Sequence, residues 1–293
     1  RLELLKPHLQ RRVRDLARDR TSLLSAYRDG GYPDAEVVPA VTRSGDGTQA
    51  QVTLRVVPGE RVDVDRLVVS GLEHTRAAVV RRALTLKEGE PLGLDRLLES
   101  QRRLAALGIF ERVGLTEIDP ESRGRRSLRV QVEEAPRITV AYGIGSAEGD
   151  PLRASVEVTH RNLFGMDRSL STFARVSFKG SRFVTTYREP FLFGRQQELF
   201  VTAFREEEDR PFFDYERVGG FLQASRTLAP SWNLILRYTY QQTDSFNIVN
   251  PGEVGREFTS STFSGPAGSF VNDTRDDPLD PHRGRFLAAD LQF

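Results

Sequence analysis

The 293-residue sequence contains no cysteine. It therefore has no disulfide framework, no cysteine-ligated zinc or iron–sulfur cluster and no thiol nucleophile. No apolar run approaches the roughly 18 residues of a membrane-spanning helix, so none is expected. Lys6, Lys87 and Lys179 are the only lysines, and the formal net charge is +1, which gives no electrostatic case for nucleic-acid binding.

Methionine is also scarce, since Met166 is the only one, and the chain opens at Arg1 without a signal-peptide pattern. We therefore expect the sequence to be a fragment or a processed product. Its mean hydropathy of −0.42 is that of an ordinary soluble protein. Such an average says little about β-barrels, because their strands alternate apolar and polar residues.

Residues 1–60 begin with a helical pattern and end with a strand pattern. The helix is expected over Leu9 to Asp29, where the Gly30-Gly31 pair stops it. In the strand that follows, polar residues alternate with apolar ones at Ala50, Val52, Leu54 and Val56.

Residues 61–135 carry a set of five elements. The pattern predicts a strand over Val64–Ser70 and a helix from a Thr75 N-cap to Leu84. A second helix, with leucines at helical spacing, is expected to end at Gly108. Two closing strands are expected over Arg112–Ile118 and Ser127–Glu134.

The order βααββ recurs, because residues 12–60 match the last three elements of one copy and residues 64–134 match a whole copy. In each copy a glycine and an aromatic residue, Tyr32 or Phe110, follow the second helix. A repeated unit of this kind resembles the POTRA domain, which implies a periplasmic module that binds polypeptides. On this resemblance, residues 1–60 are a partial POTRA domain and residues 61–135 a complete one.

Residues 136–293 change to a period of two, with about nine strands of which many are roughly 9–11 residues long or longer. A soluble sandwich would show the same alternation. Aromatic residues at strand ends, and short turns on one side against longer loops on the other, favour a membrane barrel. The expected fold class is therefore α+β POTRA domains followed by an antiparallel transmembrane β-barrel, with residues 136–293 as its N-terminal part.

Three turn sequences make a family resemblance specific. DTRDDPLDPHRG lies between two expected strands near the end of the chain, while HRNLFGMDRSL and YREPFLFGR occupy earlier turns. Preceded by POTRA-like repeats, they resemble the outer-membrane protein assembly family, the group of BamA and TamA. Barrels of that family have more strands, which implies that this sequence stops inside its barrel. The residues of the last turn motif are Asp273, Arg275, Asp276, Pro278, Pro281 and Gly284.

Other clusters suggest no catalytic chemistry. The aspartates of the last turn motif lack calcium-loop spacing because two prolines interrupt them, so we expect them to bond to the backbone of the turn. The 4 histidines lie on separate expected elements and form no metal or catalytic group. We expect no enzyme activity, no cofactor and no metal site.

The resemblance implies that strand edges do the work. A POTRA sheet edge would bind an extended client polypeptide by adding a strand, and the sequence does not choose between Val64–Ser70 and Arg112–Ile118. In the family the seam beside the first barrel strand opens sideways. Strand glycines there would weaken pairing, or else mark a bulge or turn. Candidate client-edge residues are Val64, Val68, Arg112, Val113 and Leu115; candidate seam residues are Ile138, Val140, Tyr142, Gly143 and Gly145.

The implied function is the assembly and insertion of β-barrel proteins into the outer membrane of a Gram-negative bacterium, with the POTRA domains in the periplasm. Expected partners are unfolded outer-membrane proteins and the lipid bilayer; periplasmic accessory or scaffold proteins are further candidates. Two alternatives remain open. One is a two-partner-type secretion pore for a dedicated exported protein, and the other is a structural barrel with a periplasmic scaffold-binding domain.

Overall fold

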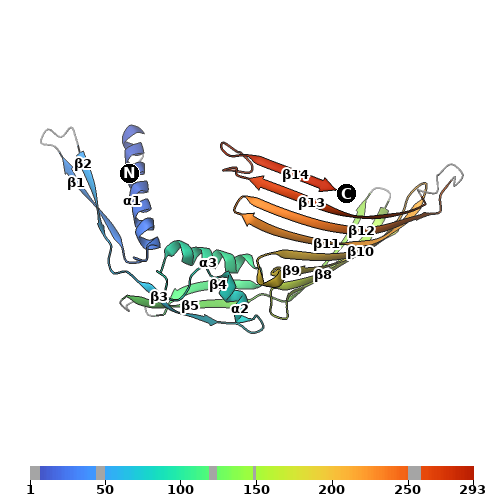
Figure 1. Ribbon diagram of the computed structural model, residues 1–293, viewed down its shortest axis with the longest axis horizontal. Helices are drawn as coiled ribbons and strands as arrows, with labels where there is room; N and C mark the ends of the chain where they lie inside the picture. Colours follow the sequence, from blue (N-terminus) through green and yellow to red (C-terminus); the bar gives the residue numbers. More distant parts are fainter. Residues whose placement is uncertain (1–6, 44–49, 119–123, 148–149, 250–258) are drawn as a thin grey trace. The chain divides into compact units, whose positions relative to one another are not determined.

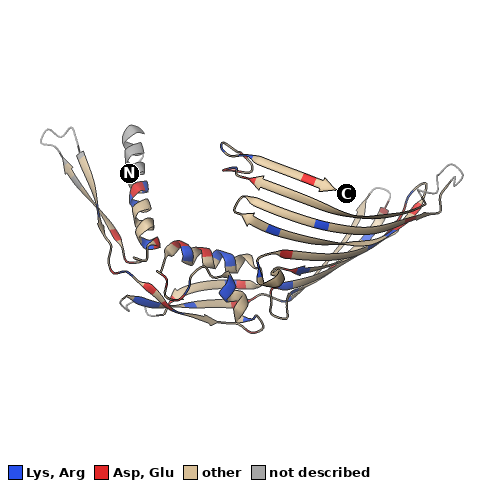
Figure 2. Cartoon of the chain, in the orientation of Figure 1, with Lys and Arg blue, Asp and Glu red and all other residues tan. Residues whose placement is uncertain are grey.

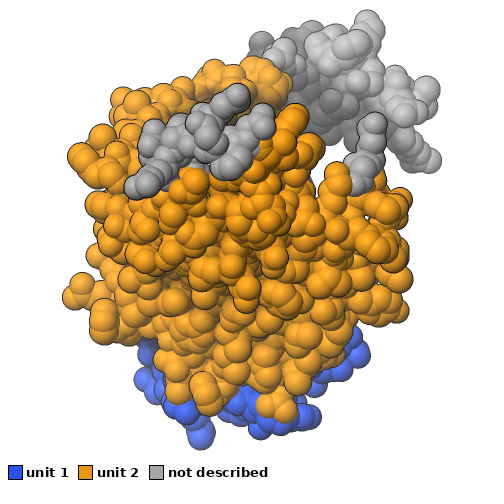
Figure 3. Space-filling view, turned by 90° about the vertical axis from the view of Figure 1, so that its right-hand side faces the viewer, with its two compact units in different colours: residues 1–135 blue, residues 136–293 orange. Residues whose placement is uncertain are grey.

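The computed structural model describes residues 7–43, 50–118, 124–147, 150–249 and 259–293 (Figure 1). The chain divides into two compact units, residues 1–135 and residues 136–293, which Figure 3 shows in different colours. No described helix is both long and apolar enough to cross a membrane.

The first unit starts with α1 (Pro7–Asp29), followed by a hairpin of β1 (Glu36–Arg43) and β2 (Ala50–Val57). Helix α1 ends at the glycine pair, as the sequence predicted. At Gly31 the backbone has φ +94°, and an added Cβ would lie 2.8 Å from the Pro91 side chain. Glycine therefore suits this turn in both conformation and space.

The remainder of the first unit is a complete βααββ motif, which confirms the expected order. Its elements are β3 (Asp63–Ser70), α2 (Ala77–Ala83), α3 (Leu94–Ala106), β4 (Phe110–Glu117) and β5 (Arg125–Glu134). The three strands form one sheet in the order β3-β5-β4, with β5 parallel to β3 and antiparallel to β4. Strands β3 and β4 are therefore the outer strands of this sheet.

The core of this motif lies between the sheet and its two helices. Alternate residues of β5 are buried, among them Leu128 and Val130, and they meet Val80 of α2 and Leu104 of α3 or their neighbours. The intervening residues of β5, such as Arg129, are exposed on the other face of the sheet. One face of the sheet is thus covered and the other faces solvent.

The second unit is a single antiparallel sheet of nine strands in sequential order, from β6 at one side to β14 at the other. Figure 1 labels β8–β14 of this sheet. This agrees with the expected strand count and with an all-antiparallel barrel wall. The strands are β6 (Ile138–Ala147), β7 (Asp150–Leu163), β8 (Arg168–Ser177), β9 (Gly180–Glu189), β10 (Glu198–Asp209), β11 (Asp214–Ala229), β12 (Trp232–Phe246), β13 (Ser260–Asp273) and β14 (Phe286–Gln292), with a 3-10 turn at Leu192–Gly194.

One face of this sheet is apolar across all its strands. Residues directly opposite each other share a face, so the pairs Val201↔Leu222 and Leu222↔Tyr238 continue one apolar row across β10, β11 and β12. These side chains are about half exposed in the described structure. Charged residues are sparse along β12–β14 (Figure 2). An apolar row facing outward in this way is what a membrane-spanning β-sheet presents to lipid.

The core assignment of the first unit predicts a specific loss of stability. Leu128→Ala removes a fully buried side chain, and we expect it to cost about 2–5 kcal/mol. Hydrogen exchange of residues 62–135 in the whole protein measures this cost. Val68→Ala is the matched control, because Val68 is 44% exposed, and it should change stability by only about 0.5 kcal/mol. Equal effects of the two variants would contradict the assigned core.

Candidate functional site

Strand β4 directs half of its backbone groups away from the sheet. Ile118, directly after β4, donates its N–H to β5 at 2.9 Å, and in an antiparallel ladder alternate residues point to opposite sides. Val113, Leu115 and Glu117 therefore turn their backbone groups outward. The Val113 carbonyl accepts a hydrogen bond from Gln101 Nε2 at 3.1 Å. No described residue accepts the outward N–H groups of the three, so β4 has a free edge.

The edge of β3 is covered from Asp63 to Leu67. The Val64 N–H donates to the Glu90 carbonyl at 2.8 Å, and the Val64 carbonyl accepts the Gly89 N–H at 2.8 Å. Further along, the Glu88 carboxylate accepts the Leu67 N–H at 3.0 Å. Val64 is also buried, so its side chain cannot contact a client polypeptide. The expectation that Val64 belongs to a client-binding edge is therefore wrong. Of the two edges that the sequence left open, β4 has three outward N–H groups without a described acceptor, whereas β3 has one, at Val69 beyond the covered part.

The candidate residues of β4 are divided between the two faces of the sheet. Val113 and Leu115 pack against the core on the helix side. Arg112 lies on the solvent side and pairs with Glu133, Nε to Oε2 at 2.9 Å. The β4 edge therefore offers mainly backbone groups to an added strand. Client binding at this edge stays a prediction.

An apolar stripe of α3 lies on the helix face that contacts β4. Gln101 reaches Val113 from this face, and Leu94, Leu97 and Leu98 precede it at helical spacing. Leu97 packs against the core, whereas Leu94 and Leu98 are 36% and 44% exposed. The helical spacing of these leucines predicts one buried helix face, but it does not show which of them lie beyond the sheet. The exposed part of the stripe and the contact of Gln101 were therefore not predicted from the sequence.

Glu134, at the end of β5, holds the loop between β3 and α2. Its carboxylate accepts the N–H groups of Glu73, His74 and Thr75 at 2.7–3.2 Å. Burial alone would raise the pKa of Glu134, but the hydroxyl of Thr75 and these backbone donors lower it to about 2. The expected Thr75 N-cap is wrong, since the N-cap is Arg76 and makes no side-chain cap. The distant Glu134 carboxylate accepts both the N–H and the hydroxyl of Thr75.

The candidate seam strand, β6, pairs with β7 from Ile138↔His160 onward. Its other edge has no partner strand in the part of the chain that the structure describes. The register becomes irregular between Gly145 and Ala147, and a Cβ on Gly145 would meet open space. The irregularity at Gly145 fits the bulge interpretation. The apolar candidate residues of β6, Ile138, Val140 and Tyr142, are exposed on the apolar face of the sheet, and Gly143 lies on the opposite face. Lateral opening of the seam beside β6 stays a prediction.

The last turn motif is held by its own side chains, as expected. Asp276 Oδ1 accepts the N–H groups of His282 and Arg283 at 3.0 Å, which lowers the pKa of Asp276. Arg275 forms an ion pair with Asp273 at 2.8 Å and also bonds the Pro278 carbonyl. Gly284 has φ +96° and follows the segment that contains Pro281. Among the described residues, no group of three His, Asp or Glu side chains could hold a metal ion.

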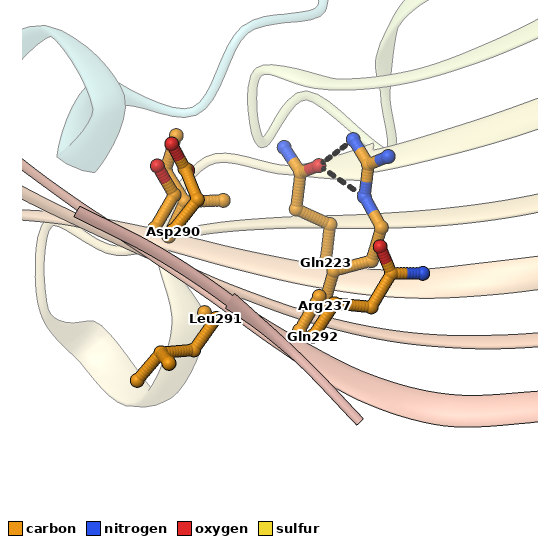
Figure 4. Close-up of a pocket in the computed structure, with 9 residues that line it drawn as sticks. Gln223, Arg237, Asp290, Leu291 and Gln292 are labelled. Atoms are coloured by element: carbon orange, nitrogen blue, oxygen red, sulfur yellow. Dashed lines mark hydrogen bonds between the residues drawn. The ribbon is translucent and has the colours of Figure 1, made fainter. Parts of the chain in front are cut away.

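A hollow of about 550 Å³ lies over β11–β14 and is lined by residues of both faces of the sheet. Arg237 and Gln223 point toward each other, and Arg237 Nε donates to Gln223 Oε1 at 2.9 Å (Figure 4). Asp290 and Leu291 lie on opposite sides of β14 (Figure 4). The guanidinium of Arg237 also covers the Phe221 ring at 4.7 Å, so its charge is already engaged within the sheet.

Two family models match the chain. Residues 162–293 match the Omp85 superfamily domain, and residues 62–135 match the POTRA model described as a surface antigen variable number repeat. The second match coincides with the βααββ motif and its free β4 edge. The first covers the antiparallel sheet from the end of β7 onward. It includes the second and third turn motifs whole and the first motif from Asn162 onward.

Curated relatives include outer membrane protein assembly factors BamA. The one from Neorickettsia risticii (strain Illinois) is 24% identical over 234 residues, covering 78% of this chain and 31% of its own length. The one from Neisseria meningitidis serogroup B is 25% identical over 235 residues, covering 80% of this chain and 28% of its own length. The chain thus spans under a third of the length of either relative.

Solved structures share the fold. BamA from Haemophilus ducreyi lacking POTRA domains 1–3 superposes with a TM-score of 0.70 at 16% identity, over 95% of this chain and 57% of that one. CdiB from Acinetobacter baumannii superposes with a TM-score of 0.52 at 12% identity, over 90% of this chain and 50% of that one.

The Glu134 contacts predict a pH dependence of stability. The pKa of this carboxyl is about 2 when folded and about 4.3 when unfolded, so its stabilising effect is complete above that range and is lost as the pH falls toward 2. We expect Glu134→Gln to destabilise the first unit at pH 7 and to flatten its loss of stability between pH 5 and pH 3.

Urea-unfolding midpoints, followed by a fluorescent label on one introduced cysteine of the first unit, measure this dependence. The cysteine-free chain makes such a label unique. Glu133→Gln is the matched control, because the neighbouring Glu133 side chain is exposed. A Glu134→Gln variant with the wild-type pH slope would show that the hydrogen bonds to Glu134 do not set this dependence.

Proposed function

Because the chain belongs to the Omp85 superfamily, with a POTRA domain ahead of barrel strands, we propose that it takes part in assembling β-barrel proteins in the outer membrane of a Gram-negative bacterium. In this proposal the POTRA domain lies in the periplasm. It captures an extended segment of an unfolded outer-membrane protein along β4. The free backbone edge of β4 is the observation that carries the proposal.

Backbone pairing suits a client that varies in sequence. Val113, Leu115 and Glu117 offer N–H groups at the spacing of an extended strand, and an added strand would satisfy them with its carbonyls. Each such bond contributes about 0.5–1.5 kcal/mol, so a few of them give weak and reversible capture. An assembly factor has to release its client, and weak capture permits this.

The second unit supplies the membrane part of the proposal. Its continuous apolar face would lie against the bilayer. Strand β6, with one edge unpaired among the described strands, would meet client strands at the seam. Nothing in this scheme requires a catalytic side chain, a cofactor or a metal, and periplasmic accessory or scaffold proteins would add to the client contacts.

A secretion pore for one dedicated exported protein is the second candidate. It differs from an assembly factor in the range of polypeptides that its POTRA domain should bind. A dedicated pore would bind segments of its single partner, whereas edge pairing for assembly would accept strands from several outer-membrane proteins with similar affinity. A structural barrel would bind none of them at β4.

Crosslinking tests the edge with a matched pair of probes. Val68 and Thr116 are both partners of Arg129 in the sheet, one on β3 and one on β4, so they stand at opposite edges beside the same residue. In the whole protein, we expect Thr116→Cys to form disulfides with single-cysteine segments of several outer-membrane proteins, about tenfold more than Val68→Cys. Equal yields at the two edges would contradict the proposal.

A further inference from the structure

A pocket of about 170 Å³ lies beside the end of β4. Leucines of α3 and of the segment before it form its apolar part, and Leu92 is almost fully buried there. The volume is room for one branched or aromatic side chain. The residues that line the pocket include Leu92, Leu94, Leu97, Pro33, Arg28 and Glu117.

Contacts between α1, its following turn and the βααββ motif hold the pocket in shape. Asp29 Oδ1 accepts the Asp95 N–H at 2.9 Å, which fixes the end of α1 against the start of α3. The lining residue Glu117 pairs with the nearly buried Arg126 at 3.0 Å, and Arg126 also pairs with Asp34, in the turn after α1. The pocket is therefore built before any ligand arrives.

Its two charged lining residues are not equivalent. The charge of Glu117 is matched by Arg126. Arg28, by contrast, has a buried Nε with no hydrogen-bond partner. Because this Nε is shielded, a ligand carbonyl would meet the terminal Nη groups of Arg28, which have no hydrogen-bond partner among the described residues. The pocket thus combines an apolar floor with one free donor.

The pocket and the β4 edge meet at Glu117, which belongs to both. Residues directly opposite one another in neighbouring strands share a face of the sheet. A client residue placed opposite Glu117 would therefore turn its side chain to the helix side, where the pocket opens. Client residues opposite Leu115 and Val113 would face the apolar stripe of α3 instead.

From this geometry we propose that the pocket anchors one apolar side chain of the client strand, while Arg28 donates to a client carbonyl beside it. This inference rests on the strand addition at β4 proposed above. Backbone pairing alone tolerates many client sequences, whereas the pocket prefers one apolar residue at one position. This preference sets the register in which an extended segment pairs with β4. The ligand class is an extended polypeptide with a leucine, isoleucine or phenylalanine at the anchored position.

Two peptides and two variants of the whole protein test the anchor. One is an extended Thr/Ser-rich peptide with a single leucine, and the other has alanine in its place. We expect the wild type to bind the leucine peptide about tenfold more tightly. Leu94→Ser should reduce this preference to about twofold, whereas Val68→Ser, a substitution of similar exposure outside the pocket, should leave it unchanged.

A third variant separates the anchor from the edge. Leu115→Pro removes an outward N–H, so it should weaken binding of both peptides, with the fold checked by hydrogen exchange of residues 62–135. If Leu115→Pro weakens binding but Leu94→Ser leaves the leucine preference intact, the anchor is wrong and the edge stands. If a folded Leu115→Pro protein binds both peptides as the wild type does, the edge itself is wrong.

Discussion

Backbone N–H and C=O groups at the edge of a β-sheet need partners, and the function proposed for this chain depends on where that need is left unmet. In the POTRA sheet, β5 is paired on both sides, and the segment that carries Glu88 and Glu90 covers β3 from Asp63 to Leu67. Strand β4 keeps outward donors without described acceptors. The difference between the two edges lies in their coverage, since both strands are short and both contribute to the same core.

The same requirement governs the second unit. Within a bilayer, backbone groups have no water to bond to, so strands there pair with neighbours. Seven of its strands, β7–β13, lie between two others, and only the two outermost have a single partner among the described residues. The apolar row across the sheet and the pairing of its backbone groups are thus both requirements of a lipid environment. The turns close these pairs with local side-chain bonds, as Asp276 shows.

Much of this architecture could be predicted from the sequence, because period and turn chemistry are local. Alternation gave the strands of the second unit, and the glycines after α1 and α3 marked the ends of the helices. What could not be predicted depends on distant partners. The Thr75 cap is wrong because α2 has Arg76 as its N-cap, and Glu134, far along the chain, holds Thr75 through its N–H and hydroxyl. The covered edge of β3 depends on a loop without periodicity, and the α3 stripe depends on how the helix sits over β4.

Amide-resolved hydrogen exchange on the whole protein, with and without a saturating segment of an unfolded outer-membrane protein, tests the free edge most directly. A free β4 edge predicts fast exchange at Val113, Leu115 and Glu117 in the free protein and roughly tenfold slower exchange in the complex. Gly114 and Thr116, whose N–H groups face β5, should be slow in both states. Unchanged exchange at the three outward amides under saturation, or protection of β3 instead, would contradict the account.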